Sequence, residues 1–351
     1  MKKRYMPGSK VSPTTSSSVP CVLPDGIHRI PLPTPFQIGD VNAWLLRGEP
    51  LTLVDAGPLM EETEARLEEG LAALGVAVED LELIFLTHQH DDHVGLAGEL
   101  RRRSGAEVAG TAALAAFLAD TGASMDADDA YSVALMRRHG VTEKTVEALH
   151  GISRAFRRFV DDVPVGRVVA DGDELRAGGR TWRVHERPGH SPTDTVLTSD
   201  GVLVAGDHLL ERISSNPIAH LPIGARDPAG LAASPERPRT LLTYAGSLRA
   251  TAAGDRGELV LPGHGDPFSG AAALVEKRLD AHERRAAKIL DALTHPRTAA
   301  DVGRDLWRHV PVTQAYLVLS EVLGHLDLLE DRGAVRAEER DGVVRYARAS
   351  P

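Results

Sequence analysis

The chain has 351 residues, of which 42% are hydrophobic, and a formal net charge of −10 at pH 7. This length allows more than one domain, and the acidic balance disfavours broad electrostatic capture of nucleic acid or of an anionic membrane. The single cysteine, Cys21, excludes an internal disulfide. No segment approaches the roughly 18 apolar residues that a membrane-spanning helix requires, so we expect a cytoplasmic protein without a membrane span.

Residues 1–20 resemble the start of a signal peptide only in their charge. Lys2, Lys3 and Arg4 are basic, but residues 7–18 are polar and lack the apolar segment of a signal peptide. We therefore expect a disordered tail over residues 1–20 or, in part, residues added by cloning.

The segment 83–95, LIFLTHQHDDHVG, concentrates potential metal ligands directly after an apolar run. Leu83–Leu86 predicts a buried strand, which places the polar cluster on a loop at its carboxyl end, where α/β sheets hold their chemistry. Two residues of a loop that are two positions apart can face one ion, and those past the bend can face a second. Imidazole and carboxylate at this density are typical of a metal site rather than a solvated turn. The candidates are His88, His90, Asp92 and His93.

Residues 111–160 predict an inserted helical segment. Apolar residues recur at helical spacings over 111–120, 128–140 and 142–160, with Gly140 ending one helix and Thr142 starting the next. We expect these helices to form a lid or pocket wall beside the metal loop, with Met136 as a substrate contact. The alternatives are a dimer contact and plain core packing. An apolar wall would favour an ester, thioester or lactone that has an acyl or ring portion.

Three later strands each end at a Gly-containing turn with a further potential ligand. His190 follows the strand 181–186, Asp207 follows an apolar run from Val202, and His264 follows 259–261. His208, next to Asp207, is a candidate supporting or pocket residue. The loop after Asp207 is too long for a simple connection, and we expect it to border the pocket with His220 as a candidate substrate contact. A helix is predicted over 235–252.

The C-terminal segment predicts helices over 271–293, 298–310 and 313–331, and then a hairpin over 333–348 with its turn at Asp341–Gly342. Three helices and a hairpin look like a winged helix. Residues 281–351, however, hold eleven basic and eleven acidic side chains, whereas a nucleic-acid reader should be basic. We therefore assign this segment to packing, dimerisation or pocket closure, and expect a small-molecule substrate rather than nucleic acid.

Together these motifs resemble the metallo-β-lactamase superfamily, the αββα hydrolases whose HxHxDH signature is followed by a distant His, an Asp and a final His. The resemblance covers roughly residues 27–270. It implies an α/β fold: an αββα metallo-β-lactamase sandwich over 21–270, with the helical insertion at 111–160 and a winged-helix-like domain at 271–351. Such a tail is found on the β-lactamase-like-2 branch of the superfamily, which includes an endoribonuclease.

The resemblance also implies roles for single residues. One metal would be held by His88, His90 and His190, and a second by Asp92, His93 and His264, with Asp207 bridging both. Two divalent ions are expected, with Zn²⁺ as the first choice and Mn²⁺ or Fe²⁺ as alternatives, because all accept these ligands. Asp55, in LTLVDAGP, would orient a ligand histidine. Asn42 matches a family asparagine and is a candidate substrate contact, although a turn-forming role fits equally.

This ligand set predicts a metal-dependent hydrolase. Two ions about 3.5 to 4 Å apart can share a hydroxide and polarise a carbonyl oxygen, with Asp92 orienting that hydroxide or taking its proton. The expected substrate is a small ester, thioester or lactone. The alternatives are an endoribonuclease or phosphodiesterase, a single-iron dioxygenase and a metal-dependent binding protein. Asp207 in place of a cysteine argues against the zinc β-lactamases with a Cys ligand, and the about 56 residues between Asp207 and His264 leave no room for a β-CASP domain.

Overall fold

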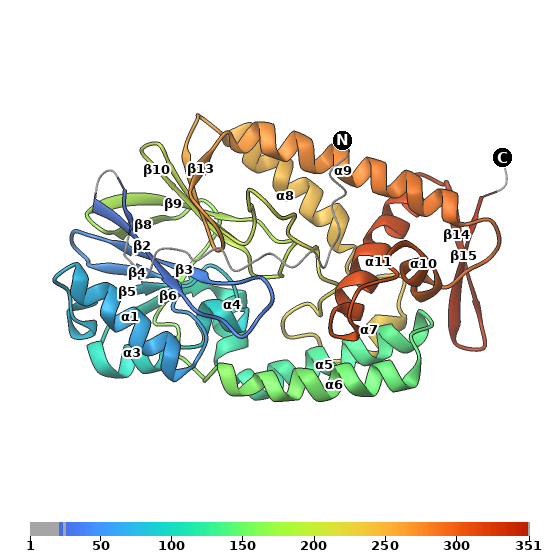
Figure 1. Ribbon diagram of the computed structural model, residues 1–351, viewed down its shortest axis with the longest axis horizontal. Coiled ribbons are helices and arrows are strands. Elements are labelled where there is room, and N and C mark those ends of the chain that lie inside the picture. The colour runs from blue at the N-terminus through green and yellow to red at the C-terminus, as the bar shows by residue number, and fades with distance from the viewer. Residues whose placement is uncertain (1–20, 24–25, 350–351) are drawn as a thin grey trace.

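The computed structural model describes residues 21–23 and 26–349. The predicted tail over 1–20 lies outside these residues. Figure 1 shows a sheet-rich lobe, which contains both large sheets and α8 (Thr240–Gly254), beside a helix-rich lobe, which contains α5 (Thr121–Arg138), α6 (Glu143–Phe156), α7 (Pro228–Ala233), α10 (Ala299–Leu306) and α11 (Ala315–Asp331). One long helix, α9, runs along both lobes.

Two mixed sheets form the sheet-rich lobe. The first has the order β1 to β7 and the second the order β13-β12-β11-β10-β9-β8. The strands of the first sheet are β1 (Cys21–Val22), β2 (Ile27–Leu32), β3 (Val41–Leu46), β4 (Thr52–Val54), β5 (Leu83–Phe85), β6 (Glu107–Thr111) and β7 (Arg167–Val169). Those of the second are β8 (Glu174–Ala177), β9 (Arg180–Glu186), β10 (Thr195–Ser199), β11 (Val202–Gly206), β12 (Leu259–Pro262) and β13 (Phe268–Ser269).

The two sheets pack face to face around one apolar core. Trp44 and Phe85 of the first sheet and Trp182 and Leu261 of the second belong to the same buried cluster. The helices α1 (Glu61–Ala73) and α3 (Ala97–Ser104) contribute Leu67, Leu71 and Leu100 to the cluster on the other face of the first sheet. The helix α8 (Thr240–Gly254) and the start of α9 (Ala271–Ala292) cover the second sheet. This layering confirms the predicted αββα sandwich.

The carboxyl ends of neighbouring parallel strands meet at one edge of this sandwich. The strands β4 and β5 run parallel in the first sheet, and β11 and β12 run parallel in the second. Asp55 directly follows β4, and Asp207 directly follows β11. The pairing therefore gathers, from distant parts of the chain, the polar residues that follow these strands. The short elements η2 (Val78–Asp80) and α2 (Asp91–Val94) complete this part of the fold.

The inserted elements are α4 (Ala112–Leu118), α5 (Thr121–Arg138), α6 (Glu143–Phe156) and the single turn η3 (Arg157–Phe159). The first of them, α4, packs on the first sheet through Leu114, Phe117 and Leu118, whereas α5 and α6 belong to the helix-rich lobe. The side chains of Tyr131, Leu135 and Leu149 share one buried cluster with Ile289 and Leu323 of the C-terminal segment. The insertion thus forms a common core with the chain's last helices. Of the alternatives for it, core packing accounts for the buried apolar side chains of the two helices, which are Tyr131, Leu135 and Met136 on α5 and Val146 and Leu149 on α6.

Met136 is a correction to the sequence interpretation. Its side chain is 2% exposed and lies inside the helical core, so it is a packing residue and not a substrate contact. The helical spacing that drew attention to Met136 comes from the buried face of α5. A second difference is α7 (Pro228–Ala233), a short helix that the sequence did not predict and that packs against α5.

The C-terminal elements follow the predicted order, with different bounds. They are α9, α10 (Ala299–Leu306), η4 (Val312–Gln314), α11 (Ala315–Asp331), β14 (Val335–Arg340) and β15 (Val343–Arg348). Asp341 and Gly342 both have positive φ at the hairpin turn, as a tight two-residue turn requires. The prediction extended α10 to Val310, but the helix ends at Leu306, ahead of Pro311. It also began α8 at Pro235, whereas the helix starts at Thr240, after Pro238. In the part of the chain that the structure describes, no helix is long and apolar enough to cross a bilayer.

Candidate metal centre

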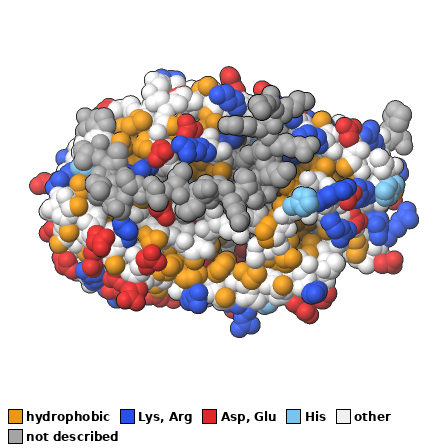
Figure 2. All heavy atoms as spheres, in the orientation of Figure 1, with side chains coloured by type: hydrophobic (Ala, Val, Ile, Leu, Met, Phe, Trp, Pro, Cys, Tyr) orange, Lys and Arg blue, Asp and Glu red, His pale blue; other side chains and the backbone are white. Residues whose placement is uncertain are grey.

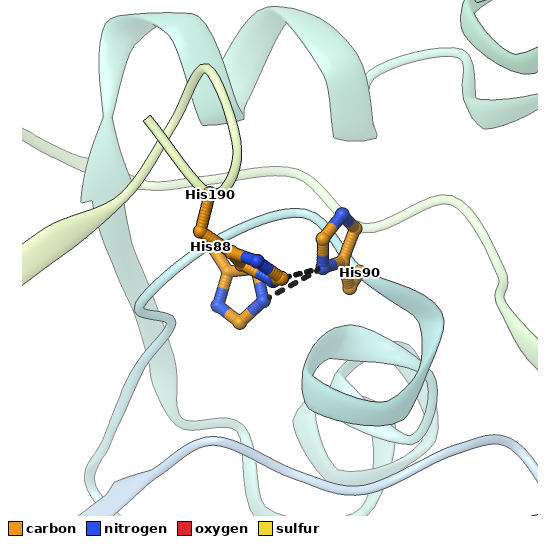
Figure 3. A group of neighbouring side chains, drawn as sticks. All are labelled: His88, His90 and His190. Atoms are coloured by element: carbon orange, nitrogen blue, oxygen red, sulfur yellow. Dashed lines mark hydrogen bonds between the residues drawn. The ribbon is translucent and has the colours of Figure 1, made fainter. Parts of the chain in front are cut away.

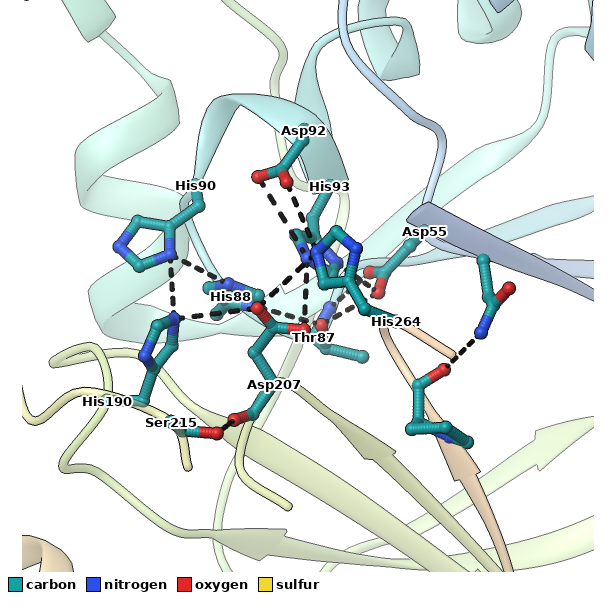
Figure 4. Close-up of polar contacts among 12 residues, drawn as sticks. Asp55, Thr87, His88, His90, Asp92, His93, His190, Asp207, Ser215 and His264 are labelled. Atoms are coloured by element: carbon teal, nitrogen blue, oxygen red, sulfur yellow. Dashed lines mark hydrogen bonds and ion pairs between the residues drawn. The ribbon is translucent and has the colours of Figure 1, made fainter. Parts of the chain in front are cut away.

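The predicted ligands from four separate segments form one cluster at the strand-end edge of the sandwich (Figure 4). Within this cluster, three groups have close ligand atoms: His88, His90 and His190; Asp92, His93 and His264; and His88, His93 and Asp207. One local expectation was wrong, because only His88 and His90 lie on a loop. Asp92 and His93 lie on the short helix α2, which begins at Asp91. The local spacing could not show this turn, because a helix of four residues has too few positions for a period.

Three histidines form the first group (Figure 3). The Nδ1 atom of His90 lies 3.0 Å from Nε2 of His88 and 3.0 Å from Nε2 of His190. His190 Nδ1 lies 3.0 Å from the carbonyl oxygen of Asn216, which can only accept, so the His190 proton lies on Nδ1. Thr87 Oγ1, 2.9 Å from Asp55 and 3.0 Å from His88 Nδ1, fits the same tautomer for His88.

These tautomers leave lone pairs facing one another. The Nε2 atoms of His88 and His190 both point at Nδ1 of His90, which carries at most one proton. At least one nitrogen therefore has no hydrogen to share in this group. Three imidazole nitrogens directed at one point satisfy one another only through a shared cation.

The second group combines two histidines with a carboxylate. His264 Nε2 lies 3.3 Å from Asp92 Oδ2, and His93 Nε2 lies 4.0 Å from Asp92 Oδ1. His93 Nδ1 lies 2.8 Å from Asp55 Oδ2, the contact that the predicted orienting role of Asp55 requires. His264 Nδ1 lies 2.8 Å from the carbonyl oxygen of Asp40. Both partners accept a ring N–H at Nδ1, so each Nε2 is free to bind an ion.

Asp207 lies between the two groups. Its Oδ2 atom is 3.7 Å from His190 Nε2 and 3.6 Å from His264 Nε2, and its Oδ1 atom is 3.5 Å from His93 Nε2. Backbone packing on this side is tight, since a Cβ atom on Gly263 would collide with Asp207 Oδ1. The glycine of the PGHG turn therefore lets the chain approach the carboxylate.

Several ligand atoms are buried without a hydrogen-bond partner in the described structure. They are His93 Nε2, Asp207 Oδ1 and His264 Nε2. Leaving buried polar atoms unpaired costs about 1 to 3 kcal/mol each, so three in one cluster indicate that a ligand is expected there. Imidazole nitrogens and carboxylate oxygens are the donor set of zinc, manganese and iron sites. The residues present therefore fit a bound divalent metal.

The electrostatics of the cluster agree with this fit. Burial lowers the pKa of His88 well below its ordinary value and that of His90 to about 3, so both rings are neutral ligands at pH 7. Burial raises the pKa of Asp207, but the neighbouring His264 and His93 outweigh it and hold that pKa well below its usual range. Burial likewise lowers the pKa of His93, yet Asp55, Asp207 and Asp92 raise it well above the ordinary value. This excess of negative charge around His93 is the environment that favours a cation.

Two further predicted residues form hydrogen bonds with residues other than the candidate ligands. The side-chain nitrogen of Asn42 donates to the carbonyl oxygens of Pro262 and Gly265 at 2.9 and 2.8 Å. Asn42 thus holds the turn that carries His264, and this corrects its assignment as a substrate contact. His208 directs Nε2 at Thr251 Oγ1, 2.9 Å away. The expected role of His208 as a supporting or pocket residue stays a prediction.

His220 remains a prediction. The residue is half-buried, and burial, together with the charge of His190, lowers its pKa to about 4, although its backbone hydrogen bonds act the other way. Its Nδ1 atom has no hydrogen-bond partner among the described residues. The sequence interpretation missed Thr87, which links Asp55 to His88, and the carbonyl groups of Asp40 and Asn216. Backbone carbonyls carry no side-chain signal, so only the folded chain could reveal them.

Comparisons with known proteins agree with this architecture. Residues 37–264 match the family model described as metallo-beta-lactamase superfamily, and residues 286–349 match that of a metallo-beta-lactamase-like C-terminal domain. A curated relative from Bacillus subtilis (strain 168), named probable metallo-hydrolase YqjP, is 35% identical over 314 residues, which span 89% of this chain and 94% of the relative.

Solved structures extend the similarity over both lobes. A beta-lactamase domain protein from Burkholderia ambifaria is similar with a TM-score of 0.77 and 29% identity, over 98% of this chain and 97% of that one. A metallo-beta-lactamase family protein from Thermus thermophilus gives a TM-score of 0.73 and 28% identity, over 93% of this chain and all of that one. By its ligand cluster, its sandwich and these matches, the chain belongs to the metallo-beta-lactamase superfamily and carries a metallo-beta-lactamase-like C-terminal domain.

Proposed function

We propose that this protein is a dinuclear metal-dependent hydrolase of a small ester, thioester or lactone. The observation that carries the proposal is the position of Asp207 between two complete ligand groups. His88, His90 and His190 would hold one ion, Asp92, His93 and His264 the other, and Asp207 would touch both. Zn²⁺ is the first choice of metal, with Mn²⁺ and Fe²⁺ as alternatives.

A pair of divalent ions in such a site activates water and polarises a carbonyl oxygen. The chain itself supplies the orientation of the ligands and a place for a proton. Burial raises the pKa of Asp92, but His93 and His264 outweigh it and keep the pKa below that of an ordinary carboxyl group. Asp92 is therefore ionised at neutral pH and is the candidate proton acceptor beside His264.

An aromatic group next to α2 supports a substrate with an acyl or ring portion. The ring of Phe36 lies 5.2 Å from that of Phe156 and 6.2 Å from that of Phe159, both at edge-to-face angles. Phe159 is held beside the metal loop, since its carbonyl oxygen accepts from Leu59 and would collide with a Cβ atom on Gly95. Phe36 and Phe156 are only half-buried, so they offer apolar surface to a ligand.

The distribution of charge supports a small substrate over nucleic acid. On the face in Figure 2, acidic and basic side chains are interspersed. The helix α11, which would be the reading helix of a winged helix, has Glu321 and Asp327 turned into the protein and paired with Arg285 and Arg237. We propose that this C-terminal region serves packing, dimerisation or pocket closure in a cytoplasmic enzyme.

A substrate panel tests the proposal most directly. Metal-free protein would be reloaded with Zn²⁺, Mn²⁺ or Fe²⁺ and assayed on thioesters, lactones, aryl esters, phosphodiesters and a short RNA, with chelator-treated protein as the control. We expect metal-dependent hydrolysis of a carbonyl ester and two ions per chain by elemental analysis. Enzyme-like cleavage of RNA or phosphodiesters would overturn the substrate class, and one iron per chain would overturn the dinuclear assignment.

The role of Asp92 has its own test. Asp92→Ala should lose turnover per bound metal, because the group that accepts the proton is gone. A variant that lost metal but kept its turnover per bound ion would show that Asp92 is only a ligand.

A further inference from the structure

A second group of potential ligands lies outside the candidate metal centre, between α9 and α11. His282 lies on α9, and Glu321 and His325 lie one turn apart on the facing side of α11. Their side chains are 4%, 9% and 0% exposed. Each offers one ligand atom, and these atoms lie within 4.8 Å of one another. Burying three such polar side chains between two packed helices costs free energy unless hydrogen bonds or a bound ligand compensate for it.

His325 is already held in the tautomer that a ligand needs. Its Nδ1 atom donates to the backbone carbonyl oxygen of Glu321, 2.6 Å away. The lone pair of His325 therefore lies on Nε2, which faces Nδ1 of His282 at 3.2 Å. The same carbonyl support is seen at His190 and His264 of the candidate metal centre. A second ring nitrogen fixed by a carbonyl is the usual support of a metal-bound histidine.

The separation between the two rings fits a shared ion. Two nitrogens bound to zinc at tetrahedral angles lie about 3.3 Å apart, and the 3.2 Å here is close to the 3.0 Å separations between His90 and its two partners. A direct hydrogen bond between His282 and His325 would account for this distance as well. In either arrangement His282 Nε2 is buried without a hydrogen-bond partner among the described residues, but a hydrogen bond between the two rings does not use the nearby carboxylate of Glu321, which is the third donor that an ion would bind.

The charge around the group is compatible with a cation. Burial lowers the pKa of His282 and of His325 to about 4, so both are neutral donors at pH 7. Glu321 supplies the negative charge. Arg285 pairs with Glu321, so an incoming ion must compete with this guanidinium for the carboxylate. The site should therefore bind more weakly than the candidate metal centre.

We propose that His282, Glu321 and His325 form a separate site for a zinc-like transition-metal ion that links α9 to α11. Two imidazoles and one carboxylate are a donor set for such an ion. The site lies where it would stabilise the molecule, because α9 packs on the sheet-rich lobe through Ala271 and Val275 and on the helix-rich lobe through Ile289. It is independent of the hydrolase proposal.

A comparison of metal content tests this proposal. The full chain with His282→Gln and His325→Gln would be loaded with Zn²⁺ beside a matched control, His295→Gln and His309→Gln, in which two exposed histidines of the same region are changed. We expect the test variant to bind one ion fewer per chain than the control. We also expect Zn²⁺ to raise the unfolding temperature of the control by more than that of the test variant. Equal metal content in the two proteins would overturn the proposal, whatever number of ions the other centre holds.

Diffraction from the unaltered protein gives a second test, which does not depend on the variants folding. Crystals of the full chain would be soaked in Zn²⁺ and measured on both sides of the zinc absorption edge. An anomalous peak between His282 and His325 is expected, in addition to peaks at the candidate metal centre. Peaks at the candidate metal centre alone would contradict the proposal while leaving the hydrolase assignment intact.

Discussion

The candidate metal centre and the buried ion pair of the helix-rich lobe satisfy their polar groups in opposite ways. At the strand-end edge of the sheet-rich lobe, His93, Asp207 and His264 direct unpartnered atoms at a common point. In the helix-rich lobe, buried charges are matched within the protein, as Arg237 is with Asp327. Unpaired lone pairs that converge need a ligand from outside, whereas paired charges hold helices in register. The first pattern therefore marks a site of chemistry and the second marks packing.

Removing the shared carboxylate should produce the largest effect. Asp207→Ala takes away the group that lies between both ligand sets, so we expect loss of bound metal and a fall in hydrolysis well beyond the roughly 10- to 100-fold typical of supporting residues. Elemental analysis and kcat/KM of the reloaded protein measure this. Retention of two ions at wild-type activity would show that Asp207 is not a bridge.

A substitution that opens a cavity in the helical core should lower the stability of the protein without affecting the candidate metal centre. Leu326 is fully buried in the helix-rich lobe, and Leu326→Ala should lower the free energy of unfolding by about 2 to 5 kcal/mol. The control Leu317→Ala, on the same helix but 37% exposed, should change it by less than about 0.5 kcal/mol. Denaturant unfolding gives both values. Hydrolytic activity below the unfolding temperature should not change, and a parallel loss of activity would mean that the lobes are coupled.

Changing a residue that orients a metal ligand should reduce metal affinity less than removing a ligand itself. Asp55→Asn keeps the shape of the side chain but removes the charge beside His93 Nδ1, so metal affinity should fall by about 10- to 100-fold. Competition with a chelator measures the affinity. An unchanged affinity would show that His93 needs no charged partner.

The smallest expected effect is on the pH dependence of the free energy of unfolding, through a buried histidine of the helix-rich lobe. Burial, with Arg237 and Arg138 nearby, lowers the pKa of His139 well below 6.5. Below pH 6.5 the unfolded chain therefore binds a proton that the folded chain does not, and stability is lost as the pH falls. The loss reaches at most about 1.4 kcal/mol per pH unit for this one group.

The substitution His139→Phe should weaken the dependence of the free energy of unfolding on pH, because the new side chain cannot bind a proton. The new ring can keep the stacking on Tyr346, where the ring centroids are 6.0 Å apart. We expect the free energy of unfolding of the variant to fall less than that of the unaltered protein between pH 7 and pH 5. Identical slopes would mean that His139 is protonated, or is hydrogen-bonded to water, in the folded protein.

Local sequence patterns predicted the elements that have a strong local signal. The apolar run before Thr87 predicted the buried strand β5, and Thr142 after Gly140 predicted where α6 begins. Asp341–Gly342 predicted the turn of the last hairpin, because few other dipeptides adopt positive φ twice. Helix ends near prolines were less well predicted, and α7 was missed, because six residues are too few to show a helical period.

The position of the inserted helices required long-range information. Their apolar faces predicted helices, but not which surface they would cover. The partner surface of α5 and α6 belongs to α7, α9 and α11, which begin more than 70 residues after the end of α6. The burial of Met136 follows from that packing alone.

The sequence by itself determined the identity of the candidate ligands, since His and Asp at the ends of successive strands are a chemical signal that needs no coordinates. Only the tertiary structure decided how they meet: Asp207 stands between two ligand groups, Asn42 holds the His264 turn, and His208 turns toward Thr251. The physical reason is that ligand type is a property of each residue, whereas the direction of a side chain depends on strand pairing and on backbone carbonyls supplied by distant segments.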